Sequence, residues 1–262
     1  MHGQLSESGK FFISWKSSFE IYVDKSELIA KTNEALCTEQ RYICVSRPRR
    51  FGKSMAANML AAYYDRSENI EELFRNLAIS KDSSYKENLN QYDVIKINMQ
   101  EFLSMSGTME EMLEMLKKYL VLDFEETYPQ VRFRDEKNLI QVMKDVFSYT
   151  RCPFVILIDE WDCLFREYKQ DREAQKKYLD FLRAWLKDKD YVALAYMTGI
   201  LPIKKYGSHS ALNMFTEYSM TDPVSWQSIL ALPNRKCQFS VKNMKMNFED
   251  CKKHWYDANS NS

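Results

Sequence analysis

The sequence is poor in glycine and carries no net charge. It has only six glycines among 262 residues, and 37 basic residues balance 37 acidic ones. Few glycines together with 14% aromatic residues argue against a disordered or low-complexity chain. The balanced charge excludes an overall attraction to nucleic acid or membrane, although a local basic patch stays open. A 45% hydrophobic share at this length is typical of a globular protein with a sizeable core.

Long hydrophobic runs and metal-binding cysteine patterns are also absent. The apolar runs, Phe154–Ile158 among them, are far shorter than the ~18 residues that span a bilayer, and no secretory signal opens the sequence. The six cysteines form no CxxC pair and no zinc-type spacing, so reduced thiols are the simplest interpretation. We therefore expect a cytoplasmic protein without membrane association.

Short apolar runs alternate with segments of helical periodicity along the chain. The continuous run at 154–158 suits a central parallel strand that is covered on both faces. The alternating order predicts an α/β fold, a three-layer sandwich with a mostly parallel central sheet. Strands are predicted at 42–45, 94–97, 154–158 and 191–197, and helices at 25–38, 53–64, 108–122, 136–149 and 171–187.

The loop between the first strand and its helix reads Arg47-Pro48-Arg49-Arg50-Phe51-Gly52-Lys53-Ser54. It fits the last three positions of the phosphate-loop pattern G-x-x-x-x-G-K-[ST], with Arg47 in the place of the first glycine. Backbone N–H groups at the start of a helix attract phosphates, and Gly52 permits their close approach. Lys53 would reach the β- and γ-phosphates, and the Ser54 hydroxyl would hold Mg²⁺. These eight residues therefore predict a binding site for ATP with Mg²⁺.

Two other interpretations of this loop are open. It could be a basic turn that caps a helix, since Gly-Lys-Ser is a short motif. Alternatively, Arg47, Arg49 and Arg50 could form a nucleic-acid patch, although one basic cluster on a neutral chain usually does not. A bound triphosphate would explain the same charge.

Two carboxylates, Asp159 and Glu160, follow the apolar strand directly. Burying unpaired carboxylates at the end of a core strand is costly, so such a pair usually faces a cleft, a cation or water. We predict that Asp159 holds Mg²⁺ through its water shell and that Glu160 is the general base for the attacking water. The alternative is that the pair caps a helix.

The position of Glu160 beside Asp159 is typical of P-loop ATPases in which an additional strand separates the two motif strands. The strand at 191–197 fits the next element and ends at Thr198. We expect Thr198 to touch the γ-phosphate or the water, with a plain strand-ending hydroxyl as the alternative. The predicted catalytic residues are therefore Glu160, Lys53 and Thr198.

Four segments resemble a known family: residues 22–29 (YVDKSELI), 47–54 (RPRRFGKS), 154–162 (FVILIDEWD) and 196–223. They are similar to the bacterial predicted AAA-ATPase family, also called AAA-ATPase-like domain proteins, over about residues 12 to 223. The resemblance implies an AAA-like P-loop fold of the class that has the additional strand (ASCE), and an arginine in place of the first glycine is this family's form of the loop. It places Lys53 and Ser54 at the phosphate and Mg²⁺ positions, with Asp159 and Glu160 at the acidic strand end. Residues 22–25 match the family's N-terminal signature, which we expect near the base or ribose.

The resemblance degrades after Asp222. It resumes weakly at 246–253, where the chain is similar to the family's FEDCKKWYDGY run, with His254 inserted and Ala258 in place of the glycine. Family members commonly carry a C-terminal domain resembling PD-(D/E)XK nucleases, which we expect to be missing here. We therefore divide the chain into a P-loop domain at 1–222 and a divergent, truncated segment at 223–262.

The most direct functional prediction is Mg²⁺-dependent ATP hydrolysis. ATP is favoured over GTP because no NKxD guanine-binding motif lies near the site. A nucleotide-binding module with little turnover is the first alternative, since Arg49, Arg50, Lys204 and Lys205 are only candidates for an arginine finger. A nucleic-acid interaction protein is the second. The expected partners are ATP and either a second copy of the chain or another protein.

Overall fold

The computed structural model describes residues 24–49, 51–67, 70–203 and 212–219. Its central sheet has five strands in the order β2-β3-β4-β1-β5, and every neighbouring pair is parallel. The α/β three-layer prediction is thereby confirmed. The additional strand between the two motif strands is β4, which pairs with both β1 and β3. The strands are β1 (Tyr42–Ser46), β2 (Asp93–Asn98), β3 (Phe154–Asp159), β4 (Val192–Gly199) and β5 (Thr216–Tyr218).

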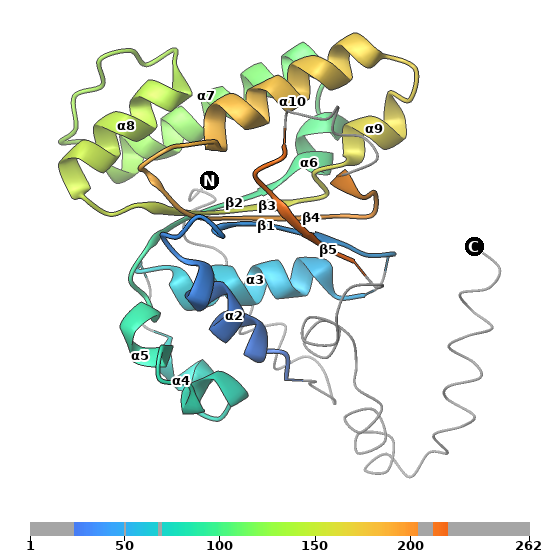
Figure 1. Ribbon diagram of the computed structural model, residues 1–262. Coiled ribbons are helices and arrows are strands. Elements are labelled where there is room, and N and C mark those ends of the chain that lie inside the picture. The colour runs from blue at the N-terminus through green and yellow to red at the C-terminus, as the bar shows by residue number, and fades with distance from the viewer. Residues whose placement is uncertain (1–23, 50, 68–69, 204–211, 220–262) are drawn as a thin grey trace, which may run out of the picture.

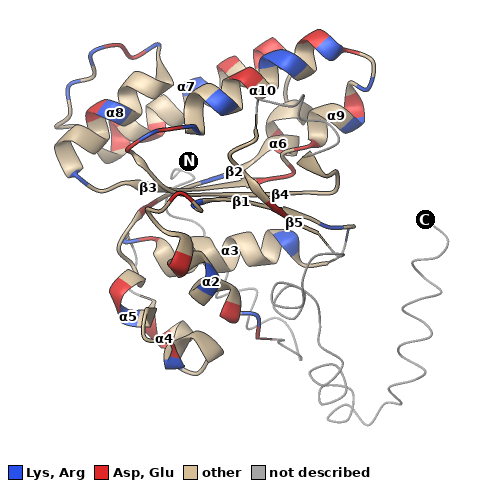
Figure 2. Ribbon diagram, in the orientation of Figure 1, with Lys and Arg blue, Asp and Glu red and all other residues tan. Residues whose placement is uncertain are grey.

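Helices cover both faces of the sheet (Figure 1). One face carries α6 (Met99–Ser104), α7 (Met109–Thr127), α8 (Leu139–Thr150), α9 (Cys163–Glu167) and α10 (Arg172–Leu186). The other face carries α2 (Glu27–Ala35), α3 (Lys53–Tyr64), α4 (Glu71–Phe74), α5 (Tyr85–Asn88) and the 3₁₀ helix η1 (Ala78–Lys81). Positions of Lys, Arg, Asp and Glu are frequent along helices α7 and α10 (Figure 2).

Strand β3 contributes to both hydrophobic cores, which explains its unbroken apolar run. Phe154, Ile156 and Ile158 pack with α7, α8 and α10, whereas Val155 and Leu157 pack with α2 and α3. All five side chains are buried, and each contributes roughly 1.5–3 kcal/mol relative to an exposed position. The two cores hold the end of β3 in a fixed place, and this is where the acidic pair begins.

The beginnings of the helices differ in a way that bears on function. The side chains of Thr108, Asn138 and Asp171 accept backbone hydrogen bonds from the first turns of α7, α8 and α10. Such caps satisfy donors that a helix leaves free at its start. Helix α3 instead has Gly52 at its N-cap position, and no described side chain caps it.

Every predicted helix and strand is present, with ends that differ by a few residues. In helix α3, Met59 and Tyr63 are buried, whereas Met55, in the first turn beside the loop, is 37% exposed. Sequence periodicity missed several short elements, because they are too short to show a repeat. These are α4, α5, α6, α9, η1 and β5.

Two expectations concern the chain as a whole. The four described cysteines, at positions 37, 44, 152 and 163, are free. Among the described residues, no helix has both the length and the apolar character needed to cross a membrane. The predicted segment at 223–262 lies outside the described residues.

Candidate functional site

The phosphate-loop candidate joins β1 to α3, and its conformation depends on Gly52. This residue has φ 75° and ψ 24°, in the left-handed region that glycine adopts without strain. The turn directs the loop into α3, whose first N–H groups have no side-chain cap among the described residues. A helix start of this kind favours an anion, through its free donors and its dipole.

Lys53, the first residue of α3, points into the loop. Its ammonium donates to the carbonyl oxygens of Arg47 at 3.0 Å and Pro48 at 3.1 Å, and the residue is only 8% exposed. Burial lowers the pKa of Lys53, while the charges of Glu160 and Asp159 oppose this shift. The ammonium is thus within electrostatic reach of the acidic end of β3.

The arginines of the loop do not form one surface patch. Arg47 is 2% exposed, and its backbone N–H donates to the carbonyl oxygen of Gly199 at 3.0 Å. Its Nε and Nη2 have no hydrogen-bond partner in the described part of the chain, and burial lowers the pKa of its guanidinium. Arg49 is exposed, as is Ser54 in the first turn of α3, and Arg50 lies outside the described residues. The predicted nucleic-acid patch therefore lacks Arg47, because this side chain turns inward.

The acidic end of β3 is held by its neighbours. Asp159 is 4% exposed, and its Oδ1 accepts hydrogen bonds from the Thr198 hydroxyl and from the backbone N–H of Glu160. The helix that follows, α9, has Asp162 at its N-cap position. Neither carboxylate of the pair caps a helix, so the alternative reading of the pair is wrong.

Glu160 is the first residue after β3, which ends at Asp159. Its φ is 54°, a left-handed conformation that is uncommon for residues other than glycine. The turn is fixed because the backbone N–H of Trp161 donates to the carbonyl oxygen of Thr198 at 3.0 Å. The Glu160 carboxylate pairs with Arg166, with Oε2 and Nη2 2.5 Å apart.

Thr198 lies within β4, which continues to Gly199. Its side chain is fully buried and donates to Asp159, so it is more than a strand-ending hydroxyl. The chain packs tightly after it: a Cβ atom on Gly199 would lie 2.6 Å from Trp161 Nε1. The strand end of β4 is therefore closely fitted to the turn after β3.

The family described as predicted AAA-ATPase matches residues 12–208, well over half of the chain. The chain belongs to the predicted AAA-ATPase family. No curated protein matches this AAA-ATPase.

One of the solved structures to which this chain is similar is that of the Aeropyrum pernix ORC1 protein in complex with DNA. It shares 12% sequence identity with this AAA-ATPase at a TM-score of 0.46. The match covers 85% of this chain and 49% of that chain, so the AAA-ATPase spans about half the length of the solved protein. The DNA belongs to the ORC1 structure and is not carried over to this chain.

Two charged residues of the site were missed by the sequence analysis. Asp162 is fully buried, and its Oδ2 accepts from the backbone N–H groups of Ile200 at 3.0 Å and Leu201 at 2.8 Å. Arg166 lies four residues further, on α9, and reaches both Glu160 and Asp162. Asp162 is the last residue of the segment 154–162, and Arg166 follows it by four residues, the spacing of an ion pair on a helix. This spacing is the sequence signal that could have identified both residues.

Strand β5 also connects to the loop through a residue that no motif marked. Glu217 Oε1 accepts from the Ser46 hydroxyl at 2.7 Å and from the backbone N–H of Ile203 at 3.0 Å. Ser46 is the last residue of β1, directly before Arg47. The edge strand thus supports the base of the phosphate loop.

The predicted N-terminal signature at 22–25 is described only from Asp24 onward. The Asp24 carboxylate accepts from the backbone N–H groups of Ser26 at 2.8 Å and Ala78 at 2.7 Å, which fixes the beginning of α2. Lys25 Nζ lies 3.7 Å from the position that a Cβ atom on Gly52 would take. Lys25 is therefore beside the loop, and a place near the base or ribose stays a prediction for this signature.

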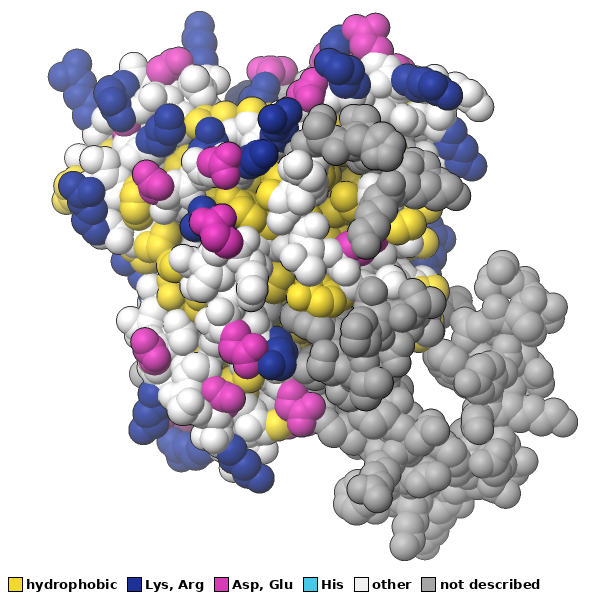
Figure 3. Space-filling view, viewed as in Figure 1, with side chains coloured by type: hydrophobic (Ala, Val, Ile, Leu, Met, Phe, Trp, Pro, Cys, Tyr) yellow, Lys and Arg dark blue, Asp and Glu magenta, His cyan; other side chains and the backbone are white. Residues whose placement is uncertain are grey.

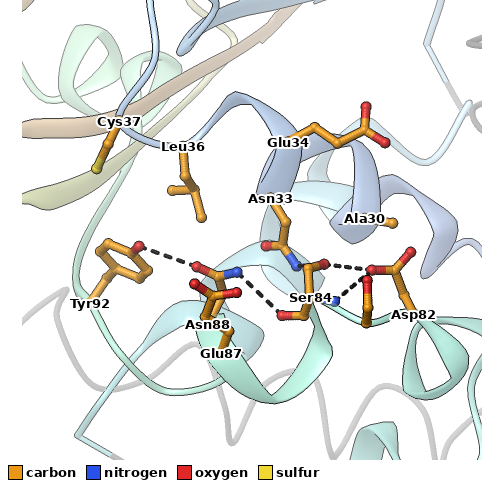
Figure 4. Close-up of a pocket in the computed structure, with 11 residues that line it drawn as sticks. Ala30, Asn33, Glu34, Leu36, Cys37, Asp82, Ser84, Glu87, Asn88 and Tyr92 are labelled. Atoms are coloured by element: carbon orange, nitrogen blue, oxygen red, sulfur yellow. Dashed lines mark hydrogen bonds between the residues drawn. The ribbon is translucent and has the colours of Figure 1, made fainter.

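A polar pocket of about 390 Å³ lies elsewhere, between α2 and α5 (Figure 4). Its side chains already bond within the chain: Asn33 Nδ2 donates to Ser84 Oγ at 2.8 Å, and Tyr92 OH donates to Asn88 Oδ1 at 3.3 Å. Leu36 and Tyr92 place it near the beginnings of β1 and β2, at the edge opposite to the loop. None of the predicted site residues lines this pocket.

Proposed function

We propose that this AAA-ATPase binds ATP with Mg²⁺ at residues 47–54 and hydrolyses it. The observation that carries the proposal is that the ends of β1 and β3 lie on either side of β4, at the same edge of the sheet. The loop with Lys53 follows β1, and Asp159 and Glu160 lie at the end of β3, although the two segments are far apart in the sequence. Burial lowers the pKa of Lys53, and the charges of the two acids oppose this shift. A phosphate-binding cation beside a metal-binding acid and a base is the arrangement that phosphoryl transfer requires.

The loop suits a triphosphate in its backbone as well as its side chains. The beginning of α3, which no side chain in the described ranges caps, offers N–H donors, and the left-handed Gly52 brings no side chain between them and a ligand. Lys53 donates to two neutral carbonyl oxygens, and phosphate oxygens would form stronger, charge-assisted bonds with its ammonium.

The acidic end suits Mg²⁺ bound together with phosphates. No group of three His, Cys, Asp or Glu side chains in the described ranges could hold a metal ion alone. Mg²⁺ does not need such a group here, because it commonly binds one or two carboxylates, substrate phosphates and several waters. Asp159 and the exposed Ser54 hydroxyl would hold it, and bound Mg²⁺ would neutralise charge on the phosphate oxygens.

Glu160 is the residue best placed to act on water. It follows Asp159 directly, and its side chain is partly accessible at 22% exposure, whereas Asp162 is fully buried. We assign it the role of orienting and deprotonating the attacking water. Thr198 supports Asp159 through its hydroxyl bond, and a contact of Thr198 with the γ-phosphate or the water remains part of the proposal.

A nucleic-acid function has less support. Arg47 is buried, and acidic and basic side chains are interspersed on the face seen in Figure 3. Steep salt dependence of nucleic-acid binding requires several exposed cations in one place. We therefore keep ATP as the proposed ligand.

A thermal-shift screen with ATP, ADP and GTP, each with and without Mg²⁺, tests the binding step. At 100 times the dissociation constant, ATP with Mg²⁺ should stabilise the protein by about 2.7 kcal/mol and raise its Tm by about 5 °C or more. Lys53→Ala should remove the shift. Lys176→Ala is the matched control, because Lys176 forms an exposed pair on α10.

A wild-type protein whose Tm does not respond to ATP would contradict the proposal. A shift with ATP that is equal in the Lys53→Ala variant would place the nucleotide elsewhere. A Lys53-dependent shift without phosphate release would support a nucleotide-binding module instead of an ATPase.

A further inference from the structure

Arg166 joins three residues around the acidic end of β3. Its Nη2 lies 2.5 Å from Glu160 Oε2 and 3.3 Å from Gln100 Oε1, and its Nε lies 3.7 Å from Asp162 Oδ2. The side chains of Arg166 and Glu160 are 16% and 22% exposed. A pair this sheltered is screened far less than a surface pair, so it can hold a geometry that an exposed pair cannot.

Hydrogen bonds already hold the backbone around Glu160, so only the direction of its side chain has to be set by other residues. Its N–H donates to Asp159 Oδ1 at 3.0 Å, and the following residue, Trp161, is bonded to Thr198. With both sides of the residue fixed and φ at 54°, the direction of the carboxylate depends on the partner of Oε2. That partner is Arg166.

Arg166 also lies near a second buried carboxylate, that of Asp162, which is bonded to the segment that follows β4. It lies one helical turn after Asp162, whose buried carboxylate accepts from the N–H groups of Ile200 and Leu201. The guanidinium therefore lies between the carboxylates of Glu160 and Asp162.

We propose that Arg166 is a positioning residue, which holds the Glu160 carboxylate where it orients the attacking water. This inference rests on the proposed ATP hydrolysis. A catalytic group displaced by about 1 Å can cost about a hundredfold in rate, so the loss of this ion pair has a measurable consequence. The nucleotide itself is held by the loop, which Arg166 does not contact through any bond described above.

The test is steady-state phosphate release from Mg²⁺-ATP by the full chain and its variants. Arg166→Gln should lower kcat about tenfold to a hundredfold with little change in KM, and Arg166→Lys should recover part of kcat. Arg66→Gln is the matched control. Arg66 also pairs with a sheltered carboxylate, that of Asp93 at 2.7 Å. Asp93 is the first residue of β2, whereas the site lies at the other end of the strands. Arg66→Gln should therefore leave kcat and KM unchanged.

A double-mutant cycle separates positioning from general stabilisation. If Arg166 acts through Glu160, Arg166→Gln should have no further effect on kcat in a Glu160→Gln background. An equal fold-loss in both backgrounds would overturn the inference, as would an Arg166→Gln variant with unchanged or raised kcat. If Arg166→Gln does not fold, the cycle is run with Arg166→Lys, for which we expect a partial loss of kcat. An Arg166→Lys variant with the full wild-type kcat would overturn the inference.

The inference and the proposed function fail in different ways. Wild-type hydrolysis no faster than that of Glu160→Gln defeats the proposed function and this inference with it. Wild-type hydrolysis that depends on Glu160 but not on Arg166 defeats the inference alone.

Discussion

The hydroxyl of Thr198 donates a hydrogen bond to the carboxylate of Asp159 and so joins the end of β4 to the end of β3. Both residues are almost fully buried, where a hydrogen bond is stronger than in water and an unpaired acceptor is costly. The bond therefore fixes the direction of the carboxylate that we expect to hold Mg²⁺. It also gives Thr198 a role that can be tested apart from any contact with phosphate.

Thr198→Val should destabilise the protein, because it keeps the shape of the side chain and removes the donor. We expect a loss of about 1–3 kcal/mol in the free energy of unfolding, measured by urea denaturation. Thr198→Ser, which keeps the hydroxyl, should lose about 1 kcal/mol or less. A valine variant as stable as the serine variant would show that the bond contributes nothing.

Gly52→Ala should affect both stability and nucleotide binding. The φ of 75° is strained for alanine, at a cost of roughly 1 kcal/mol, although the nearest atoms, Lys25 Nζ and Met55 Sδ, leave ordinary contact distances of 3.7 and 3.8 Å. The added methyl group should also reduce the Tm shift caused by ATP. Urea denaturation and the thermal-shift assay measure the two effects, and an unchanged ATP shift would contradict the role of this backbone turn.

Gly199→Ala should be more damaging than Gly52→Ala, for a different reason. The new Cβ atom would lie 2.6 Å from Trp161 Nε1 and 2.9 Å from Asp162 Oδ1, both in fully buried side chains. Overpacking of this kind costs about 1–3 kcal/mol. If urea denaturation shows that Gly52→Ala loses more stability than Gly199→Ala, the close packing of β4 against the turn after β3 does not explain why glycine is needed at position 199.

Much of this site was predictable from the sequence. Glycine followed by lysine at the start of a helix, and two acids after an apolar strand, each have a local physical cause. Their meeting follows from parallel strands, whose carboxyl ends share one edge of the sheet. The apolar run of β3 indicated a strand covered on both faces, and both cores are present.

What could not be predicted depends on side-chain direction and on short elements. Whether Arg47 points outward or inward is decided by tertiary packing, and it points inward. The left-handed turn at Glu160 has no local signature, because glutamate does not favour it. Arg166 was overlooked because α9 has only five residues, too few to reveal a periodic face.

Asp145→Asn should lower stability at neutral pH and much less in strong acid. Burial raises the pKa of Asp145, but hydrogen bonds from Arg134 and Gln141 outweigh it and hold the pKa below the ordinary 3.8. The ionised form therefore stabilises the folded state fully above about pH 4, and this contribution is lost as the pH falls through the lower folded-state pKa.

We expect a difference of about 1 kcal/mol between wild type and Asp145→Asn at pH 7, since Arg134 is 69% exposed and the pair is partly screened. Urea denaturation at pH 7 and below pH 3 measures it. Asp180→Asn is the control, because Asp180 pairs with Lys176 on the surface and should change little at either pH. A difference that persists unchanged below pH 3 would contradict the assigned role of the charge.

The most direct test of ATP hydrolysis at this site is the rate of phosphate release from Mg²⁺-ATP by wild type and Glu160→Gln, with ATP binding measured in parallel. Glutamine keeps the size of the side chain and removes the base. We predict that wild type releases phosphate, that Glu160→Gln is slower by about a hundredfold or more, and that both bind ATP. Equal rates in the two proteins, or no release from either, would contradict the account.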